Sequence, residues 1–120
     1  MPDNSRQETR LPQAQTIFIE VRSSYPGDSG GCRLLVCNSV DVSANGIRAR
    51  IDDGLPIGAI YPLCVEIHEP AERLFLVAEV KWVRPAEDND GYYVGLAVFE
   101  SDDTDIERWK RHIADQLSRQ

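Results

Sequence analysis

Two short stretches of this 120-residue sequence carry side chains that suit the recognition of a charged ligand. In "RQETR", Arg6 and Arg10 are separated by three residues. In "DVSANG", a carboxylate, a hydroxyl and a glycine fall together at Asp41, Ser43 and Gly46. The planar guanidinium group of arginine forms two parallel hydrogen bonds to a phosphate or a guanine, and it can stack on a base. By residue type alone, the first stretch suits an anion and the second suits a small polar pocket.

Each stretch also has a simpler interpretation. Two arginines in a polar terminus are typical of a solvated tail, and the residue types of "DVSANG" are those of an ordinary hairpin turn. Arg48 and Arg50 follow this stretch directly. For Arg48, ligand contact and surface charge are equally open, whereas surface charge is favoured for Arg50. The choice between these interpretations depends on the secondary structure that positions the residues.

Strand patterns dominate the chain before its last twenty residues. Hydrophobic and polar residues alternate with the period of a strand that has one face on a core, and turn residues separate the segments. Consecutive strands of this kind predict an antiparallel barrel or sandwich, in which closure protects the edges. Trp82 shares the face of Leu74 and Val80 and is therefore predicted in the core, while Gly95 indicates a bulge or a close backbone approach. The six segments are 16–22, 32–42, 46–51, 61–68, 73–83 and 92–99.

The C-terminal segment changes to helical spacing. Ile106, Trp109 and Ile113 recur on one face, which predicts an amphipathic helix. Thr104 and Glu107 form a capping box that predicts where this helix starts. The apolar stripe needs a surface to cover. We therefore predict a mainly β protein, a six-stranded antiparallel barrel with a C-terminal helix across one opening or flank.

The composition is that of one globular domain. Hydrophobic residues make up 42% and charged residues 28% of a chain that is long enough to bury a single core. No apolar run approaches the roughly 20 residues needed to cross a bilayer, and the polar N-terminus lacks the apolar stretch of a signal peptide. We therefore expect a cytoplasmic protein without membrane insertion.

The formal net charge of −7 argues against a DNA- or RNA-binding protein, because nonspecific affinity for phosphate backbones comes from positive charge. The charge is unevenly spread. Residues 1–50 hold six Arg against five Asp and Glu, a balance of +1, and residues 51–120 hold seven basic and fifteen acidic residues, a balance of −8. An acidic protein of this kind can keep a local anion site in its first part.

The sequence shows no pattern of an enzyme. Cys32, Cys37 and Cys64 lack metal-ligand spacing, so they are predicted to be reduced strand residues without a bound metal. A Ser-His-Asp order, a phosphate loop and a paired-carboxylate site are all missing from the sequence. A binding protein is the class that remains.

Taken in order, the motifs resemble the PilZ domain, a bacterial receptor module for cyclic di-GMP. RxxxR precedes the first strand, DxSxxG joins the second and third, "VKW" lies in the fifth and "YYVGLAVF" in the sixth. The resemblance runs from about Arg6 to Glu100, and the C-terminal helix also fits the family. RxxxR alone is a weak motif, but the ordered pair within this strand pattern is specific. The resemblance implies a flexible N-terminal segment at residues 1–15 and a barrel domain with its helix at residues 16–120.

The resemblance also assigns roles to the two stretches. Arg6 and Arg10 would bind phosphate and stack on or grip guanine when the N-terminal segment folds over the ligand. Asp41 would accept hydrogen bonds from guanine N–H groups. Ser43 would bond to the guanine or to a nearby phosphate, and Gly46 would let the backbone approach closely. "DVSANG" is then polar because it faces a ligand.

The implied function is a single-domain cyclic di-GMP receptor and effector that couples ligand binding to contact with an unidentified protein partner. The processes it would serve are motility, attachment or biofilm control. Ser5 precedes RxxxR at a position that varies in the family, so one and two bound ligand molecules are both compatible with the sequence. No cofactor is expected besides this ligand. The alternative is a PilZ-like interaction module that binds no nucleotide, as in branches that assist type IV pilus assembly, although those branches usually lack the arginine pair.

Replacing Arg10 with alanine tests the role of the arginine pair. The Arg10→Ala change removes a charge-assisted contact and a stacking surface, so cyclic di-GMP should bind more weakly by roughly 1.5–3 kcal/mol, about tenfold to a hundredfold. The loss should shrink as salt rises, because the contact is ionic. Calorimetric titration at two salt concentrations measures both effects, and an affinity equal to that of the wild type would remove Arg10 from the site.

Overall fold

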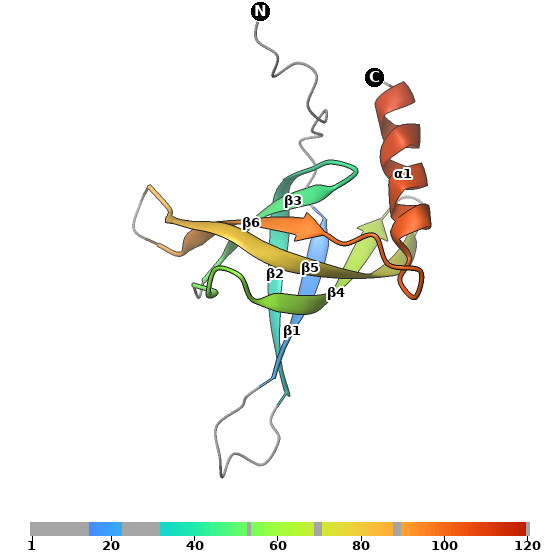
Figure 1. Ribbon diagram of the computed structural model, residues 1–120. Coiled ribbons are helices and arrows are strands. Elements are labelled where there is room, and N and C mark those ends of the chain that lie inside the picture. Colours follow the sequence, from blue (N-terminus) through green and yellow to red (C-terminus); the bar gives the residue numbers. More distant parts are fainter. Residues whose placement is uncertain (1–14, 23–31, 53, 69–70, 88–89, 120) are drawn as a thin grey trace, which may run out of the picture.

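The computed structural model describes residues 15–22, 32–52, 54–68, 71–87 and 90–119 (Figure 1). Six strands and one helix follow each other along the chain, as the sequence pattern predicts. They are β1 Thr16–Arg22, β2 Cys32–Val42, β3 Gly46–Ile51, β4 Ile60–His68, β5 Ala71–Pro85, β6 Tyr92–Val98 and α1 Ile106–Ser118.

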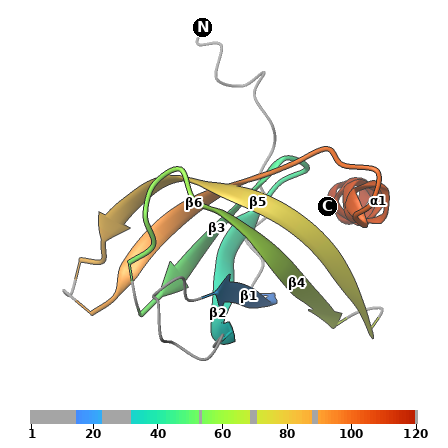
Figure 2. The same cartoon turned by 60° about the horizontal axis from the view of Figure 1, so that its bottom comes forward.

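The six strands form a closed barrel in the order β1-β2-β3-β6-β5-β4, and every neighbouring pair is antiparallel. Figure 2 shows the strands curving around a common interior, with α1 beside the end where β2 turns into β3. Closure pairs the strand edges with one another, which removes the exposed donors and acceptors of an open sheet. The predicted antiparallel barrel with a C-terminal helix is confirmed.

The inward positions of the strands build one hydrophobic core. Aliphatic side chains alternate inward on each strand, as the period of two requires. Cys37 also lies in this interior, where burial raises the pKa of its thiol to about 12, so it is not a reactive thiolate. Core side chains without solvent exposure include Ile17, Ile19, Val42, Ala49, Val65, Leu76, Ala78, Val80 and Val94.

Two irregularities reverse the alternation of side chains on the strands. In β2 the register with β3 shifts between Ser39 and Asp41, and in β5 the register with β6 shifts between Val80 and Trp82. A bulge inserts one unpaired residue, so each side chain beyond it points to the other face. Ser39 and Val80 are buried on the inner side, whereas Asp41 is paired with Arg48 on the outer face of β3.

The bulge in β5 corrects the prediction that Trp82 lies in the core. A strict alternation would place Trp82 inward with Leu74 and Val80, but Lys81 is the extra residue in the pairing. Val83 packs against the core instead, and the half-buried Trp82 ring lies on the outer face. An alternating pattern read from the sequence carries no mark of an inserted residue, which is why the prediction was wrong.

Helix α1 covers the end of the barrel with the predicted stripe. Ile106, Trp109 and Ile113 are buried and belong to the same hydrophobic cluster as the strand interiors. The buried position of Trp109 confirms its predicted place in the core. A helix of this kind is stable because its apolar face is covered, more than through its own propensity.

The start of α1 differs from the predicted capping box. The helix begins after Asp105, and no side chain caps its N-terminus. Thr104 Oγ1 donates to the Ser101 carbonyl at 2.7 Å. The Asp105 carboxylate accepts from the backbone N–H of Phe75 at 2.7 Å, while the Asp105 N–H donates to the Phe75 carbonyl at 2.8 Å. The predicted box with Thr104 and Glu107 is therefore wrong, because bonds between Asp105 and β5 fix the start of the helix.

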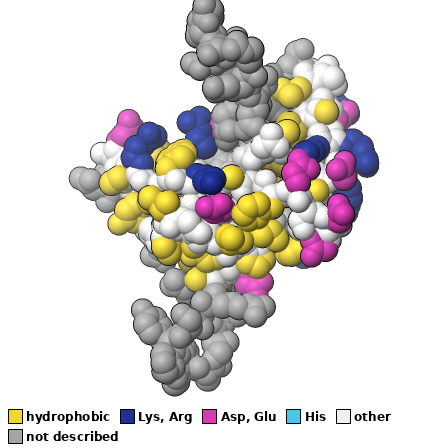
Figure 3. Space-filling model, viewed as in Figure 1, with side chains coloured by type: hydrophobic (Ala, Val, Ile, Leu, Met, Phe, Trp, Pro, Cys, Tyr) yellow, Lys and Arg dark blue, Asp and Glu magenta, His cyan; other side chains and the backbone are white. Residues whose placement is uncertain are grey.

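The outer face of β2, β1, β4 and β5 carries an apolar row. Val36, Phe18, Cys64 and Phe75 are opposite one another on these four strands in turn. Val36 is 64% exposed and Phe75 is 43% exposed. Figure 3 shows hydrophobic side chains gathered over β4 and β5 in the lower middle of the molecule. Apolar surface of this kind is typical of contact sites for other molecules.

None of the described helices is long and apolar enough to span a membrane.

Two glycines with positive φ allow a matched test of the connections between strands. Gly58 has φ +92° with no atom near an added Cβ, whereas Gly91 has φ +95° and an added Cβ would lie 2.7 Å from the Ile51 carbonyl oxygen. Gly58→Ala should lower the free energy of unfolding by about 1–2 kcal/mol through backbone strain. Gly91→Ala should lower it by roughly 2–5 kcal/mol, because backbone must also move. Urea unfolding measures both, and equal losses would contradict the assigned clash.

Candidate ligand-binding site

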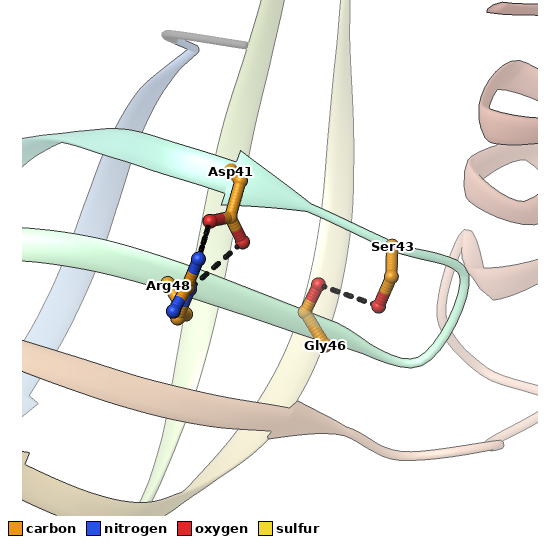
Figure 4. A network of polar contacts seen from close by, with 4 residues as sticks. All are labelled: Asp41, Ser43, Gly46 and Arg48. Atoms are coloured by element: carbon orange, nitrogen blue, oxygen red, sulfur yellow. Dashed lines mark hydrogen bonds and ion pairs between the residues drawn. The ribbon is translucent and has the colours of Figure 1, made fainter. Parts of the chain in front are cut away.

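An ion pair joins β2 and β3 next to the turn that connects them. Arg48 Nε donates to Asp41 Oδ2 at 2.8 Å and to Oδ1 at 3.0 Å, and the terminal amine of Arg48 contacts the same carboxylate. Figure 4 shows the two side chains pointing at each other from neighbouring strands. The hydrogen bonds to Asp41 raise the pKa of Arg48 above its usual value. Asp41 is nearly buried while Arg48 is 45% exposed, so the pair presents its cationic side to solvent.

The turn itself is closed by Ser43 and Gly46. The Ser43 N–H donates to the Gly46 carbonyl at 2.8 Å, and the Ser43 hydroxyl donates to the same oxygen at 3.3 Å (Figure 4). Ser43 has no exposed surface. The Val98 N–H donates to the Asn45 carbonyl at 2.9 Å, which ties the turn to β6. The structure therefore uses the serine of "DVSANG" to hold the turn.

One row of residues crosses four strands on the outer face, starting from the ion pair. Asp41 is opposite Arg48, Arg48 is opposite Gly95, and Gly95 is opposite Trp82. The glycine leaves room for the indole, because a Cβ at Gly95 would lie 2.1 Å from Trp82 Nε1. The predicted close approach at Gly95 is thus made by a side chain. The Trp82 ring thus occupies the space over Gly95 on β6.

A second row lies one step along the strands and carries two more arginines. Arg50 is opposite Tyr93, and Tyr93 is opposite Arg84. The Arg84 guanidinium carbon is 5.4 Å from the centre of the Trp82 ring and 5.8 Å from that of Tyr93, and the Arg50 guanidinium carbon is also 5.8 Å from the Tyr93 ring. Cations at this distance are attracted to aromatic faces. The rings and guanidinium groups form a connected platform.

The platform lines two adjoining hollows. One has a volume of about 480 Å³ and lies between Arg48, Trp82, Arg84 and Tyr93. The other has a volume of about 340 Å³ and lies over Gly95 and along the turn. Arg48 and Trp82 line both hollows. Figure 3 shows basic and hydrophobic side chains together at the left of the molecule, where β5 ends and β6 begins. This surface suits a flat ligand that carries negative charge.

The structure brings together only part of the predicted site. Asp41, Gly46 and Arg48 lie on adjacent strands at the same end of the hairpin, and Ser43 lies buried in its turn. Arg6 and Arg10 lie outside the described residues, as do residues 1–14 of the predicted N-terminal segment 1–15.

Sequence reasoning missed three residues of the platform, Trp82, Arg84 and Tyr93. The alternating pattern predicts Trp82 in the core and assigns no role to Arg84 and Tyr93. The available signal was the glycine at Gly95, which predicted a close approach without naming the approaching group. Among the described residues, no cluster of three or more His, Cys, Asp and Glu side chains could hold a metal ion.

Comparisons with known proteins agree with this fold. The PilZ domain family matches residues 4–115 of the chain. No relative with a curated description matches the sequence. The fold is similar to that of the inhibitor of motility MotI/DgrA from Bacillus subtilis, at 18% identity and a TM-score of 0.68 over 96% of this chain and 52% of that one.

Two structures of YcgR from Escherichia coli, both with c-di-GMP, are also similar. The PilZ domain of YcgR gives 12% identity and a TM-score of 0.62 over 95% of this chain and 92% of that one. The longer YcgR complex gives 15% identity and a TM-score of 0.67 over 95% of this chain and 46% of that one. The chain therefore spans about half the length of MotI/DgrA and of the longer YcgR chain.

Replacing Gly95 with alanine tests the platform. The added methyl group occupies the place of the Trp82 ring, whose outer side is open, so the ring should swing away while the barrel stays folded. We expect the free energy of unfolding to fall by roughly 1–3 kcal/mol. In nitrogen-15 spectra the indole signal of Trp82 should move and that of the buried Trp109 should stay. A Trp82 signal unchanged from the wild type would show that the ring does not rest on Gly95.

Proposed function

The chain belongs to the PilZ domain family, whose domains are receptor modules rather than enzymes, and on that premise we propose that it is a cyclic di-GMP receptor. The ligand is placed on the outer face of β3, β6 and β5, next to the β2–β3 turn. The observation that carries the proposal is the row from Asp41 through Arg48 and Gly95 to Trp82. This row places a carboxylate, a guanidinium group and an aromatic ring side by side on one surface. These groups can contact the edge of a guanine, a phosphate and the flat face of the base.

The platform supplies the contacts to a base and to a phosphate. Guanine has a flat face that stacks on aromatic rings and on guanidinium planes, and its O6 and N7 atoms accept from arginine. Arg84 is exposed, and its guanidinium carbon lies 5.4 Å from the centre of the Trp82 ring and 5.8 Å from that of Tyr93, so it is the proposed stacking partner of the base. Arg48 and Arg50 add positive charge for phosphate oxygens on an otherwise acidic protein.

Asp41 is the proposed acceptor for the guanine edge. Arg48 donates to both oxygens of its carboxylate. A carboxylate at this position accepts from guanine N1–H and N2–H groups, which adenine lacks. In this proposal Asp41 sets the preference for guanine and Arg48 holds the carboxylate in place. Ser43 acts by fixing the turn, since its hydroxyl is bonded to the Gly46 carbonyl and fully buried.

The N-terminal arginines complete the proposed site. Arg6 and Arg10 precede β1, and β1 pairs with β2 beside the hairpin that carries Asp41. We propose that this segment folds over the ligand and changes the surface offered to a partner protein. The processes we propose are motility, which the inhibitor of motility MotI/DgrA is named for, and attachment or biofilm control.

A second candidate function is an interaction module that binds no nucleotide. It is favoured by the apolar row of Val36, Phe18, Cys64 and Phe75 on the barrel surface, since exposed apolar patches often contact proteins. This row includes none of the platform residues.

Titration calorimetry with cyclic di-GMP and with cyclic di-AMP tests the proposal. The wild type should bind cyclic di-GMP more tightly than cyclic di-AMP, and Asp41→Ala should reduce this preference. Arg84→Ala should weaken cyclic di-GMP binding about tenfold or more, as loss of a charge-assisted contact does. Arg73→Ala is the matched control, because Arg73 lies on the same strand but is bonded to Glu66. Its affinity should stay within about twofold of the wild type. A wild type that binds no cyclic di-GMP overturns the proposal and leaves the interaction module.

A further inference from the structure

A side chain of helix α1 forms a hydrogen bond to the β2–β3 turn of the candidate site. Trp109 is fully buried, and its Nε1–H donates to the Ser43 carbonyl oxygen at 3.1 Å. Figures 1 and 2 both show the β2–β3 turn beside α1. The indole thus brings a hydrogen bond to the turn from outside the six strands.

The same helix also reaches the start of β1. The Gln15 N–H donates to Ser39 Oγ at 2.8 Å, and the Ser39 N–H donates to the Gln15 carbonyl at 3.0 Å. The side-chain nitrogen Nε2 of Gln15 lies 3.4 Å from His112 Nε2. Burial lowers the pKa of His112 below its usual value, against the opposing effect of Glu72 and Asp115. His112 and Trp109 are close on α1, with ring centres 6.2 Å apart.

These contacts connect α1 to the two chain segments that carry the candidate site residues. Ser39 stands two residues before Asp41, and Gln15 stands five residues after Arg10. If α1 left its place, the Ser43 carbonyl would lose the indole donor, and a buried acceptor without that bond is unfavourable. The geometry of the turn and the docking of the helix are therefore thermodynamically coupled. Such a link acts in both directions.

We propose that Trp109 is a positioning residue for the turn from Asp41 to Gly46, so that docking of α1 raises the affinity of this turn for its ligand. Ligand binding in return strengthens the docking of α1. The identity of the ligand rests on the proposed function, whereas the link between helix and turn does not.

The first test compares two variants of α1 in titrations with cyclic di-GMP. Trp109→Phe keeps a buried ring but removes the N–H donor, and it should weaken binding roughly threefold to tenfold, as loss of one hydrogen bond does. Ile113→Val is the control, because Ile113 is buried on the same helix and the change removes one methyl group without touching the turn. Its affinity should stay within about twofold of the wild type. Thermal unfolding checks that both variants are folded at the titration temperature.

The second test needs no ligand. The Ser43 amide, which bonds within the turn, should exchange with solvent faster in Trp109→Phe than in the wild type and Ile113→Val. The Val65 amide in β4 should exchange alike in all three proteins. This difference would not arise if Trp109 only filled space in the core, because Ile113→Val weakens the same packing.

The wild type provides a third measurement in case Trp109→Phe does not fold. Saturation with cyclic di-GMP should slow the exchange of the Trp109 indole proton. Unchanged exchange of that proton in a wild type that binds the ligand would overturn the proposal. So would equal affinities of Trp109→Phe and the wild type, or equal exchange of the Ser43 amide. A wild type without affinity for cyclic di-GMP overturns the proposed function, and the Ser43 exchange then decides the link between helix and turn by itself.

Discussion

The candidate site depends on one constraint of strand geometry, the strict alternation of side chains between the two faces of a sheet. Two bulges, one in β2 and one in β5, break that alternation at the points where the site needs it. Each inserts a single residue and moves the side chains beyond it to the other face. Asp41 and Trp82 thereby face outward, while Val42 and Val83 take the places toward the core. Without these shifts, the carboxylate and the indole would lie inside the barrel, on the side of its hydrophobic core.

The barrel gives this surface a rigid base. Each strand pairs on both sides, so the rows from Asp41 to Trp82 and from Arg50 to Arg84 are held by backbone hydrogen bonds on adjacent strands. Gly95 lets the indole rest on β6, and the two aromatic rings orient Arg84. Groups that are oriented before a ligand arrives lose less freedom when it binds. The face is consequently suited to bind a flat, charged molecule with little rearrangement of the strands.

Some polar groups hold the site together, and others are proposed to contact the ligand. Ser43 and the backbone of the turn are bonded within the protein, and Trp109 joins that turn to α1. Arg48 fixes the Asp41 carboxylate through hydrogen bonds to both of its oxygens. Arg48, Arg50 and Arg84 share this face, where Arg48 is paired with Asp41 and Arg50 with Asp90.

The sequence by itself determined the six strands and the amphipathic helix, because alternation and helical spacing follow from covalent geometry and burial. The strand pattern alone fitted either an antiparallel barrel or a sandwich, and the need to cover the apolar stripe of the helix favoured the barrel. It also named Asp41, Gly46 and Arg48 as candidate ligand contacts, and the hairpin brings these residues together on adjacent strands. Tertiary structure decided the rest. The outward position of Trp82 and the start of α1 depend on bulges and on bonds between distant segments, such as that of Asp105 to Phe75. The platform of Trp82, Arg84 and Tyr93 and the bond from Trp109 to Ser43 join residues far apart in the chain, and no local pattern encodes which strands will be neighbours.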